Sequence, residues 1–377
     1  MRFQKFGKLD WEVSVLGFGA MRLPVIDNDP TRIDEAEATR IMRYGIDHGI
    51  NYVDTAYPYH SGEGEPVVGR ILRDGYRERV KLATKLPSWL VMNAGDFDRY
   101  LDAQLDRLQT DHIDFYLLHA LRDSTWPLMQ RLHVFDWADK ALADGRISHL
   151  GFSFHDRYEM FQEIVDAYDN WAMCQIQYNY MDIAYQAGMR GLKYAAARGI
   201  AVVAMEPIRG GRIAQNVPPA IEAMWDTAAH KRTPADWALQ WLWSQPEVTL
   251  VLSGMSALEQ VQQNIASAER SRVGLLTEEE LALIAQVREK YLQLNPIPCT
   301  DCRYCIPCPS GVNIPRIFEL YNDACKYDAL QIPKMLYASL AEQNRANQCV
   351  ECGQCMVQCP QHIEIPDWLE KAHALLA

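Results

Sequence analysis

The sequence lacks the features that mark membrane and nucleic-acid-binding proteins. It has no run of about 18 apolar residues, the length that a membrane-spanning helix needs. It has no block of five or more Lys and Arg residues, and its formal net charge is −12, so the concentrated basic surface that binds phosphate backbones is not expected. The first residues alternate in polarity without the apolar core of a signal peptide. We therefore expect a cytoplasmic protein without a membrane or nucleic-acid partner, and a homo-oligomer is left open.

Cysteine is scarce in most of the chain and concentrated at its end. Of the ten cysteines, only Cys174 precedes residue 299. A disulfide framework is not expected, because the cytosol keeps thiols reduced. Clustered cysteines in such a protein are typical of metal ligands.

Short apolar runs rich in β-branched residues recur along the chain, with helical periodicity between them. The runs begin about 24 to 47 residues apart, near the ~30 residues of a strand with its crossover helix. The predicted strands are Val13–Leu16, Asn51–Asp54, Val80–Ala83, Phe115–His119, His149–Phe152, Met173–Gln177, Ala201–Met205 and Val248–Leu252. The predicted helices include Glu35–His48, Phe97–Leu108, Met160–Tyr168 and Ala257–Ala268. Eight such units predict an α/β fold, a closed (β/α)8 TIM barrel, with an open doubly wound sheet as the alternative.

Two segments flank the predicted barrel. Met1–Val13 alternates around Gly7–Asp10, which predicts a hairpin that plugs the barrel bottom. A last helix is expected from the N-cap Thr277 to about Leu294, where an Asn-Pro-Ile-Pro sequence ends it. The predicted domains are therefore a barrel at 1–294 and a small, mainly α-helical domain at 295–377, with a helical stretch near 314–346.

Eight cysteines form two closely spaced runs. They are Cys299-x2-Cys302-x2-Cys305-x2-Cys308-Pro309 and Cys349-x2-Cys352-x2-Cys355-x3-Cys359-Pro360. The second run has the bacterial ferredoxin spacing. Four cysteines packed so closely suit an iron–sulfur cubane better than zinc, which usually takes two CxxC pairs from separate loops and is the alternative. We predict two [4Fe–4S] clusters bound by these eight cysteines.

The tail resembles a two-cluster ferredoxin, in which the fourth ligand of each cluster comes from the other run. The resemblance implies one cluster on Cys299, Cys302, Cys305 and Cys359, and another on Cys308, Cys349, Cys352 and Cys355. The first run departs from the ferredoxin pattern, because two residues rather than three precede its last cysteine.

Polar residues stand at three successive predicted strand ends, where a barrel of this kind places its reactive groups. They are Asp54 with Tyr59, then Lys85, then His119. A Tyr hydroxyl can act as a general acid when a neighbouring ammonium lowers its pKa, and a buried Asp keeps that Lys charged. A neutral His can donate a hydrogen bond that polarises a carbonyl group. Reduction of a carbonyl by hydride requires such a set.

These motifs resemble those of the aldo-keto reductase family over residues 1 to about 290. The matching stretches are LGFGAMR from Leu16, DTAYPYHSGEGEPVVG from Asp54, ATK ending in Lys85, DFYLLH ending in His119, GFS ending in Ser153 and LSGMSALEQVQQN ending in Asn264. With the cysteine-rich tail, the whole chain resembles the iron–sulfur branch of that family. The resemblance implies a catalytic tetrad of Asp54, Tyr59, Lys85 and His119, because the family places its Tyr five residues after the Asp.

The resemblance also implies a nicotinamide cofactor extended across the barrel mouth. Its carboxamide would meet Ser153 and Gln175, and we also assign Glu206, after the seventh strand, and Arg212, which with Arg209 could supply positive charge. The adenosine end would meet Gly254, Ser256, Gln260, Gln263 and Asn264. Relatives with glycine and glutamine at the places of Gly254 and Gln260 take NADPH, so NADP(H) is favoured over NAD(H).

The implied activity is NAD(P)H-dependent reduction of a small aldehyde or ketone, or oxidation of the alcohol, with Tyr59 as general acid. The clusters would exchange single electrons with a ferredoxin-type partner. One alternative is a redox-sensing or accessory electron-transfer protein whose barrel binds nicotinamide without turnover. Another is a tail whose clusters only staple about 80 residues that lack a large core.

Overall fold

The computed structural model describes residues 1–27, 29–299 and 301–377. The chain forms two compact units. The first comprises Met1–Gly210 and Ala235–Glu278, and the second comprises Gly211–Pro234 and Glu279–Ala377. We expected a boundary after Leu294, whereas this division places the preceding helix, and also an internal segment of the chain, in the second unit.

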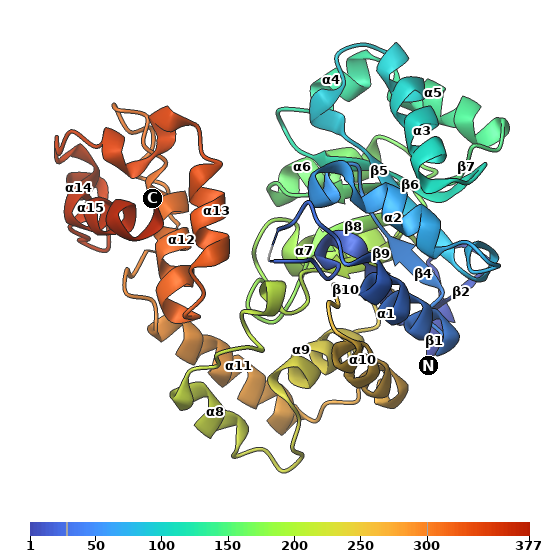
Figure 1. The fold of residues 1–377 in the computed structure, drawn as a ribbon. Helices are drawn as coiled ribbons and strands as arrows, with labels where there is room; N and C mark the ends of the chain where they lie inside the picture. Colours follow the sequence, from blue (N-terminus) through green and yellow to red (C-terminus); the bar gives the residue numbers. More distant parts are fainter. Residues whose placement is uncertain (28, 300) are drawn as a thin grey trace. The chain divides into compact units, whose positions relative to one another are not determined.

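Eight parallel strands close into a barrel in the first unit (Figure 1). The barrel order is β10-β3-β4-β5-β6-β7-β8-β9. The strands are β3 (Leu16–Gly19), β4 (Tyr52–Asp54), β5 (Lys81–Leu86), β6 (Ile113–Leu121), β7 (Ile147–Phe154), β8 (Met173–Gln177), β9 (Ala201–Met205) and β10 (Leu250–Ser253). The predicted TIM barrel is confirmed, and the open sheet is excluded.

Helices surround this barrel and cover the outer face of its strands. They are α1 (Glu35–Asp47), α2 (Gly64–Ile71), α3 (Gly95–Leu108), α4 (Trp126–Arg131), α5 (Val134–Ala143), α6 (Tyr158–Asp166), α7 (Gly188–Ala196), α9 (Pro234–Trp243) and α10 (Leu258–Arg270). Strands enclosed on both faces are apolar almost throughout, which explains their continuous rather than alternating runs. Helix α1 begins where the side chain of Asp34 accepts a hydrogen bond from the backbone N–H of Glu37.

A hairpin precedes the barrel, as predicted. Its strands β1 (Phe3–Lys5) and β2 (Glu12–Ser14) pair antiparallel. Phe6, in the connection between them, is fully buried, and its ring centroid lies 4.8 Å from that of Phe115. Gly7 has φ +55°, and a Cβ there would lie 2.5 Å from a backbone oxygen, so the turn needs glycine. The predicted strand Val13–Leu16 was misplaced, because the apolar run spans the end of β2 and the start of β3.

The second unit is helical and has its own small core. Its helices are α8 (Pro219–Trp225), α11 (Glu278–Gln293), α12 (Ile314–Lys326), α13 (Gln331–Ala338), α14 (Gln354–Gln358) and α15 (Ile365–Leu376). Helices α12, α13 and α15 pack together (Figure 1), and cysteines of both runs pack against the core that they form. The predicted helical stretch 314–346 is broken into α12, α13 and two short 3-10 turns, η6 (Glu342–Asn344) and η7 (Ala346–Gln348).

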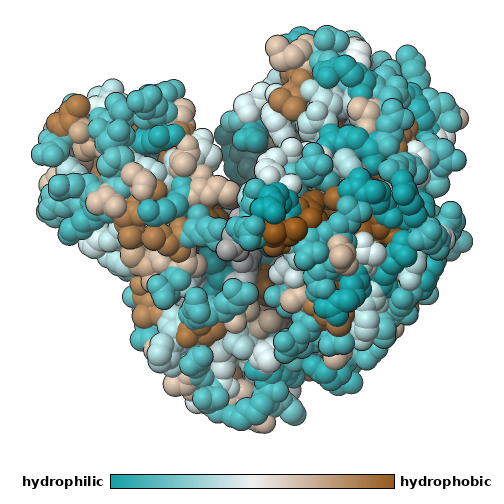
Figure 2. All heavy atoms as spheres, viewed as in Figure 1, coloured by the Kyte–Doolittle hydropathy of each residue, from teal (hydrophilic) through white to brown (hydrophobic). Residues whose placement is uncertain are grey.

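The internal segment 211–234 is held in the second unit by buried contacts. Arg212 forms an ion pair with Asp323 of α12, and the two side chains are 12% and 5% exposed. Ile213 and Ile221 of the same segment are fully buried. Hydrophilic residues cover most of the visible face of each unit in Figure 2. Within the described part of the chain, no helix is both long and apolar enough to cross a bilayer.

Candidate active site and cysteine-lined cavities

A buried ion pair lies where β4 and β5 end. Lys85 Nζ is 2.7 Å from Asp54 Oδ1, and both side chains are 1% exposed. The ammonium also donates to the backbone oxygen of Thr55 at 2.8 Å, and Gln175 Nε2 donates to Asp54 Oδ2 at 3.2 Å. The strand register explains the approach, because Asp54, the last residue of β4, pairs with Ala83 and Lys85 follows two residues later on β5.

Tyr59 approaches the same ammonium from the loop after β4. Lys85 Nζ lies 3.4 Å from the Tyr59 hydroxyl and 5.0 Å from the centre of its ring. The loop is held by His60, whose Nε2 accepts from the backbone N–H of Leu23 at 3.2 Å. Tyr57 has different partners, since its ring packs against Tyr100 at 5.3 Å. The geometry therefore places Tyr59, rather than Tyr57, beside the ion pair.

His119 is positioned by an irregularity near the end of β6. The pairing of β6 with β7 shifts register between Leu118 and Leu121, and Ala120 has φ +52°. The backbone N–H of Ala120 donates to Ser153 Oγ at 2.7 Å, which holds this bulge. Bulges redirect side chains at the rims of barrels. The His119 ring meets the Tyr59 ring edge to face, with centroids 6.4 Å apart and an interplanar angle of 83°.

Burial sets the protonation states of this group. Burial lowers the pKa of Lys85, but Asp54 and Tyr59 outweigh it, so the net pKa is raised and the ammonium stays charged. Burial lowers the pKa of His119 well below its ordinary value, so the ring is neutral near pH 7. Burial raises the pKa of Tyr59, and Lys85 only partly opposes this. We expected a lowered pKa for Tyr59; the structure instead gives a phenol that firmly holds its proton.

A buried polar network supports the end of β5 and was not anticipated from the sequence. Glu65 Oε1 accepts from Thr84 Oγ1 at 2.6 Å and from Gln104 Nε2 at 2.5 Å. Gln104 Nε2 also donates to the backbone oxygen of Lys85 at 3.1 Å. This network fixes the backbone of the residue that carries the ammonium. The sequence shows Glu65 only as a carboxylate six residues after Tyr59. Nothing in its spacing indicates that its partner is Gln104 on α3.

The residues predicted for the nicotinamide carboxamide lie beside the tetrad. Gln175 binds Asp54, and its side-chain oxygen remains available as an acceptor. Ser153 Oγ accepts from Ala120, and its hydroxyl hydrogen remains available as a donor. Both side chains are buried, and they are neighbours because Ser153 pairs with Gln175 across β7 and β8.

The residues predicted for the adenosine end gather after β10 and along α10. The backbone N–H of Ser256 donates to Gln260 Oε1 at 2.9 Å, and Asn264 Nδ2 donates to Ser253 Oγ at 3.2 Å. Gln263 Nε2 donates to Glu259 Oε1 at 3.0 Å and is exposed. This group is thus held by contacts within its own loop and helix.

The predicted cofactor residues Glu206 and Arg212 are each held by a different ion-pair partner. Glu206 forms an ion pair with Arg22, N to O 3.3 Å, and the side chain of Arg22 also lies against Gly254. Arg212 pairs instead with Asp323 of the second unit, and Arg209 pairs with Asp182 at 3.3 Å. Arg22 was visible in the sequence as the last residue of the LGFGAMR motif, but no role was assigned to it.

The two cysteine runs share one backbone pattern. In each run the second residue after the first cysteine has positive φ, 53° at Asp301 and 54° at Glu351. The residue after the second cysteine repeats this, with 65° at Arg303 and 73° at Gly353. These left-handed residues curl the chain so that successive cysteines face one side. Each run then leads through Cys-Pro to a helix that begins Ile-Pro, α12 and α15 respectively.

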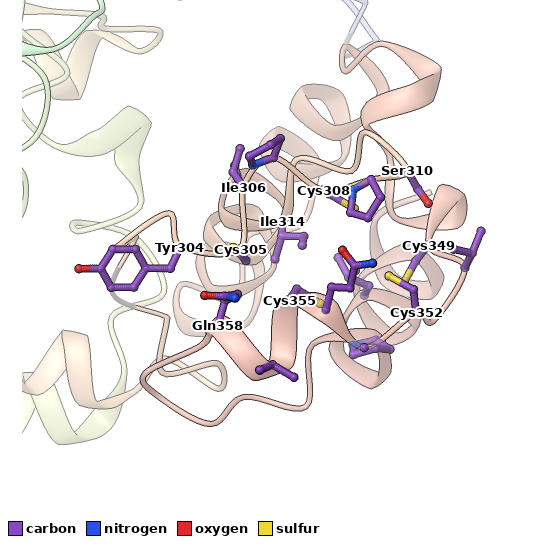
Figure 3. A pocket seen from close by; sticks show the side chains of 18 residues that line it. Tyr304, Cys305, Ile306, Cys308, Ser310, Ile314, Cys349, Cys352, Cys355 and Gln358 are labelled. Carbon is purple, nitrogen blue, oxygen red and sulfur yellow. The ribbon is translucent and has the colours of Figure 1, made fainter.

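Each run contributes to two cavities in the second unit. The first cavity is lined by Cys299, Cys302, Cys305 and Cys359. The second cavity is lined by Cys305, Cys308, Cys349, Cys352 and Cys355, which are labelled in Figure 3. Each cavity therefore contains three cysteines of one run and the last cysteine of the other, and Cys305 lines both cavities.

The electrostatics of the thiols agree with this grouping. Burial raises the pKa of Cys299, and the neighbouring Cys302 and Cys359 add to the rise. Burial likewise raises the pKa of Cys355, with Cys349 and Cys308 among its neighbours. In the described residues no group of three or more His, Cys, Asp or Glu side chains is close enough to hold a metal ion. Four thiols around an open cavity fit a cubane cluster, which is larger than one ion.

Comparisons with known proteins match both parts of the chain. The model of the aldo/keto reductase family matches residues 15–289. The model of the 4Fe-4S dicluster domain matches residues 298–364. These two matches support the predicted pairing of a reductase barrel with an iron–sulfur tail.

Individual relatives are similar over the barrel. The methylglyoxal reductase YeaE of Escherichia coli is 28% identical, over 71% of this chain and 91% of that protein. The structure of the aldo-keto reductase AKR11C1 from Bacillus halodurans, in its holo form, has a TM-score of 0.63 at 27% identity, covering 76% of this chain and 96% of that one. An aldo-keto reductase from Klebsiella pneumoniae in complex with NADPH has a TM-score of 0.60 at 27% identity, covering 76% and 95%.

Proposed function

This chain belongs to the aldo/keto reductase family of NAD(P)-dependent oxidoreductases, and we propose that it reduces small aldehydes or ketones with Tyr59 as the proton donor. The reverse reaction would oxidise the corresponding alcohol. The observation that carries this proposal is the buried ammonium of Lys85, which lies between Asp54 and the Tyr59 hydroxyl. The name of the Escherichia coli relative supports a small aldehyde as the first substrate to try.

The ion pair prepares Tyr59 to give up its proton. A buried phenol alone resists ionisation, which is why burial raises the pKa of Tyr59. The ammonium of Lys85 stabilises the phenolate that forms when the proton moves to the developing alkoxide. Asp54 keeps that ammonium charged although its side chain is only 1% exposed. The phenol is therefore protonated at rest and assisted at the moment of transfer.

His119 orients the substrate carbonyl in this proposal. Its ring is neutral, and Nδ1 is buried without a hydrogen-bond partner among the described residues. A neutral imidazole can donate one hydrogen bond to the carbonyl oxygen without adding a competing acid. Trp89 packs against this ring at 5.0 Å and is 40% exposed, so an aromatic wall borders the place of the substrate.

A nicotinamide bound at the barrel mouth would supply the hydride. Ser153 can donate to its carboxamide oxygen, and Gln175 can accept from its amide nitrogen, because both keep those hydrogen-bonding capacities. The adenosine end would meet Gly254, Ser256, Gln260, Gln263 and Asn264. We propose NADP(H) as the preferred cofactor, and the Klebsiella pneumoniae relative was solved with NADPH.

Arg22, rather than Arg212, is proposed as the basic residue near the cofactor phosphates. The buried pair of Arg212 with Asp323 would have to break before Arg212 could bind elsewhere, and an unpaired buried charge is costly. Arg22 is 37% exposed, and its partner Glu206 is 27% exposed, so this pair can open at little cost. Arg22 also lies against Gly254, where the predicted adenosine-binding residues begin.

The tail is proposed to hold two [4Fe–4S] clusters, with the fourth ligand exchanged between the runs. The two cavities support this, since Cys359 lies with the first run and Cys308 with the second. The clusters would store single electrons for exchange with a ferredoxin-type partner. Cluster ligands must stay as thiolates that are not oxidised to disulfides, so a reducing compartment suits the tail, and we propose the cytoplasm.

Two tyrosine variants test the catalytic assignment. Anaerobically purified protein is assayed with methylglyoxal and other small aldehydes, using NADH and NADPH in parallel. Tyr59→Phe removes the hydroxyl, so kcat should fall about 10²- to 10⁴-fold while nicotinamide binding, followed by fluorescence, is unchanged. Tyr57→Phe is the matched control, since it removes a hydroxyl from a tyrosine two residues away in the same loop, whose ring packs against Tyr100 and not against the ion pair. Equal activity of the two variants would reject Tyr59 as the acid.

A further inference from the structure

Large apolar side chains are exposed around the second cavity. Tyr304 is 66% exposed, Ile306 41%, Val350 69% and Val357 86%, and all four line that cavity. We call these four residues the apolar rim. They come from both cysteine runs. Tyr304 and Ile306, labelled in Figure 3, belong to the first run, and Val350 and Val357 belong to the second. Water contact on so many large apolar groups around one site is typical of an interaction surface.

The first cavity is bordered differently. Its apolar lining, which includes Phe318, Ile363 and Ile365, is buried in the core of the unit. The exposed residues at its border, apart from Cys302, are the polar Arg303 and Gln361. Each cavity has one exposed cysteine, so cysteine exposure alone does not distinguish the two. The apolar rim does, because the cysteine runs otherwise share the same backbone pattern.

The surroundings of the apolar rim are acidic. Residues 349–371 contain four acidic side chains and one basic side chain, Lys371. The four are Glu351, Glu364, Asp367 and Glu370, and all are exposed. The nearest basic residue of the first run, Arg303, is paired with Asp301 at 3.2 Å and adds little net charge. A partner that meets this surface should therefore be basic.

We infer that the second cavity is the port through which electrons are exchanged with a carrier protein. The partner would present a one-electron centre near an apolar contact patch ringed by basic residues. This inference rests on the proposed two-cluster function. In one encounter the reduced carrier loses one electron and the group held by Cys308, Cys349, Cys352 and Cys355 gains it, and no proton moves. Such an encounter needs only a small, weak interface, which four apolar residues and a charged border can supply.

The test uses two measurements on the full-length protein with its clusters. Binding is measured with zinc-substituted cytochrome c, a basic and redox-inert probe, by calorimetry. Electron transfer is measured by stopped flow from dithionite-reduced protein to ferric cytochrome c. Val350→Lys and Val357→Lys place a cation in the apolar rim, whereas Val273→Lys makes the same change at a 49% exposed valine of the first unit. Iron content and visible absorbance are recorded for every variant.

We expect both rim variants to lower the affinity and the rate at least five-fold, with Val273→Lys unchanged. Rate and affinity of the wild type should fall with rising salt, because opposite charges steer the encounter. Transfer to a small acceptor dye should be equal in all variants. Equal rates in rim and control variants with full iron content would overturn the port while leaving the clusters intact. Absence of iron and of cluster absorbance in the wild type would instead reject the proposed clusters, and the port with them.

Discussion

Replacing Asp54 by Asn tests whether the buried ion pair is as costly to break as its burial implies. The substitution nearly keeps the shape and lets the side-chain oxygen still accept from Gln175. It leaves the Lys85 ammonium, 1% exposed, with only neutral partners. Removing one partner of a buried pair typically costs about 3–5 kcal/mol. The bond from Lys85 to the backbone oxygen of Thr55 remains, so we expect about 3 kcal/mol.

The matched control is Asp114→Asn. The Asp114 side chain is also buried, 2% exposed, and is paired with Arg77 and Lys81 at 2.8 Å and 2.9 Å. The Lys81 side chain is 44% exposed and can turn to water when the carboxylate is removed. The control should therefore lose less stability than Asp54→Asn. Urea unfolding followed by far-UV circular dichroism measures both, and the double variant Asp54→Asn/Lys85→Met should recover much of the loss.

The pH dependence has opposite signs in the wild type and the variant. In the wild type the pKa of Lys85 is raised, so its stabilisation is present below the unfolded pKa of about 10.4 and is lost as the pH rises through the folded pKa. Without Asp54, burial lowers that pKa below the unfolded value, and the unfolded state binds more protons. Stability of Asp54→Asn should then rise with pH up to about 10.4. A loss under 1 kcal/mol that does not depend on pH would refute the reasoning.

Three further outcomes follow from the site and the fold. Cys359→Ser should lower the iron content by about half or more, because Cys359 lines the first cavity. Cys325→Ser, which lies outside both cavities, should leave the iron content unchanged. Equal iron contents of the two variants in a colorimetric assay would contradict the exchange of ligands between the runs. The pKa of His119 is depressed, so NMR titration of its ring should show no protonation between about pH 6 and 8. Phe6→Ala should destabilise the barrel by about 3–5 kcal/mol in urea, and a loss near zero would show that the hairpin does not plug the barrel.

Local patterns in the sequence were sufficient to predict the barrel, the cysteine-rich tail and the polar residues that gather at the barrel rim. The strands are covered on both faces, so each reads as a short apolar run, and regular spacing follows from one helix per strand. Asp54, Lys85 and His119 could be predicted to lie close together, because the parallel strands of a barrel end at the same rim. The cysteine spacing was sufficient to predict the iron–sulfur tail, because a short loop that wraps a cluster needs cysteines at close, regular intervals. The first strand was misplaced for a local reason too, since two apolar strands adjoin there.

Contacts between distant parts of the chain decided the rest. The bulge that aims His119 depends on a hydrogen bond from Ala120 to Ser153 on the next strand. The placement of Arg212 depends on Asp323, 111 residues away, which draws the internal segment into the second unit. Neither Ser153 nor Asp323 can be recognised as the partner from spacing or periodicity. Many other serine and aspartate residues have the same chemistry, and only the packing of the folded chain brings these two into contact. The sequence alone therefore predicted which residues gather at the barrel rim and around the two cavities, and the tertiary structure decided how each is oriented and with what it is paired.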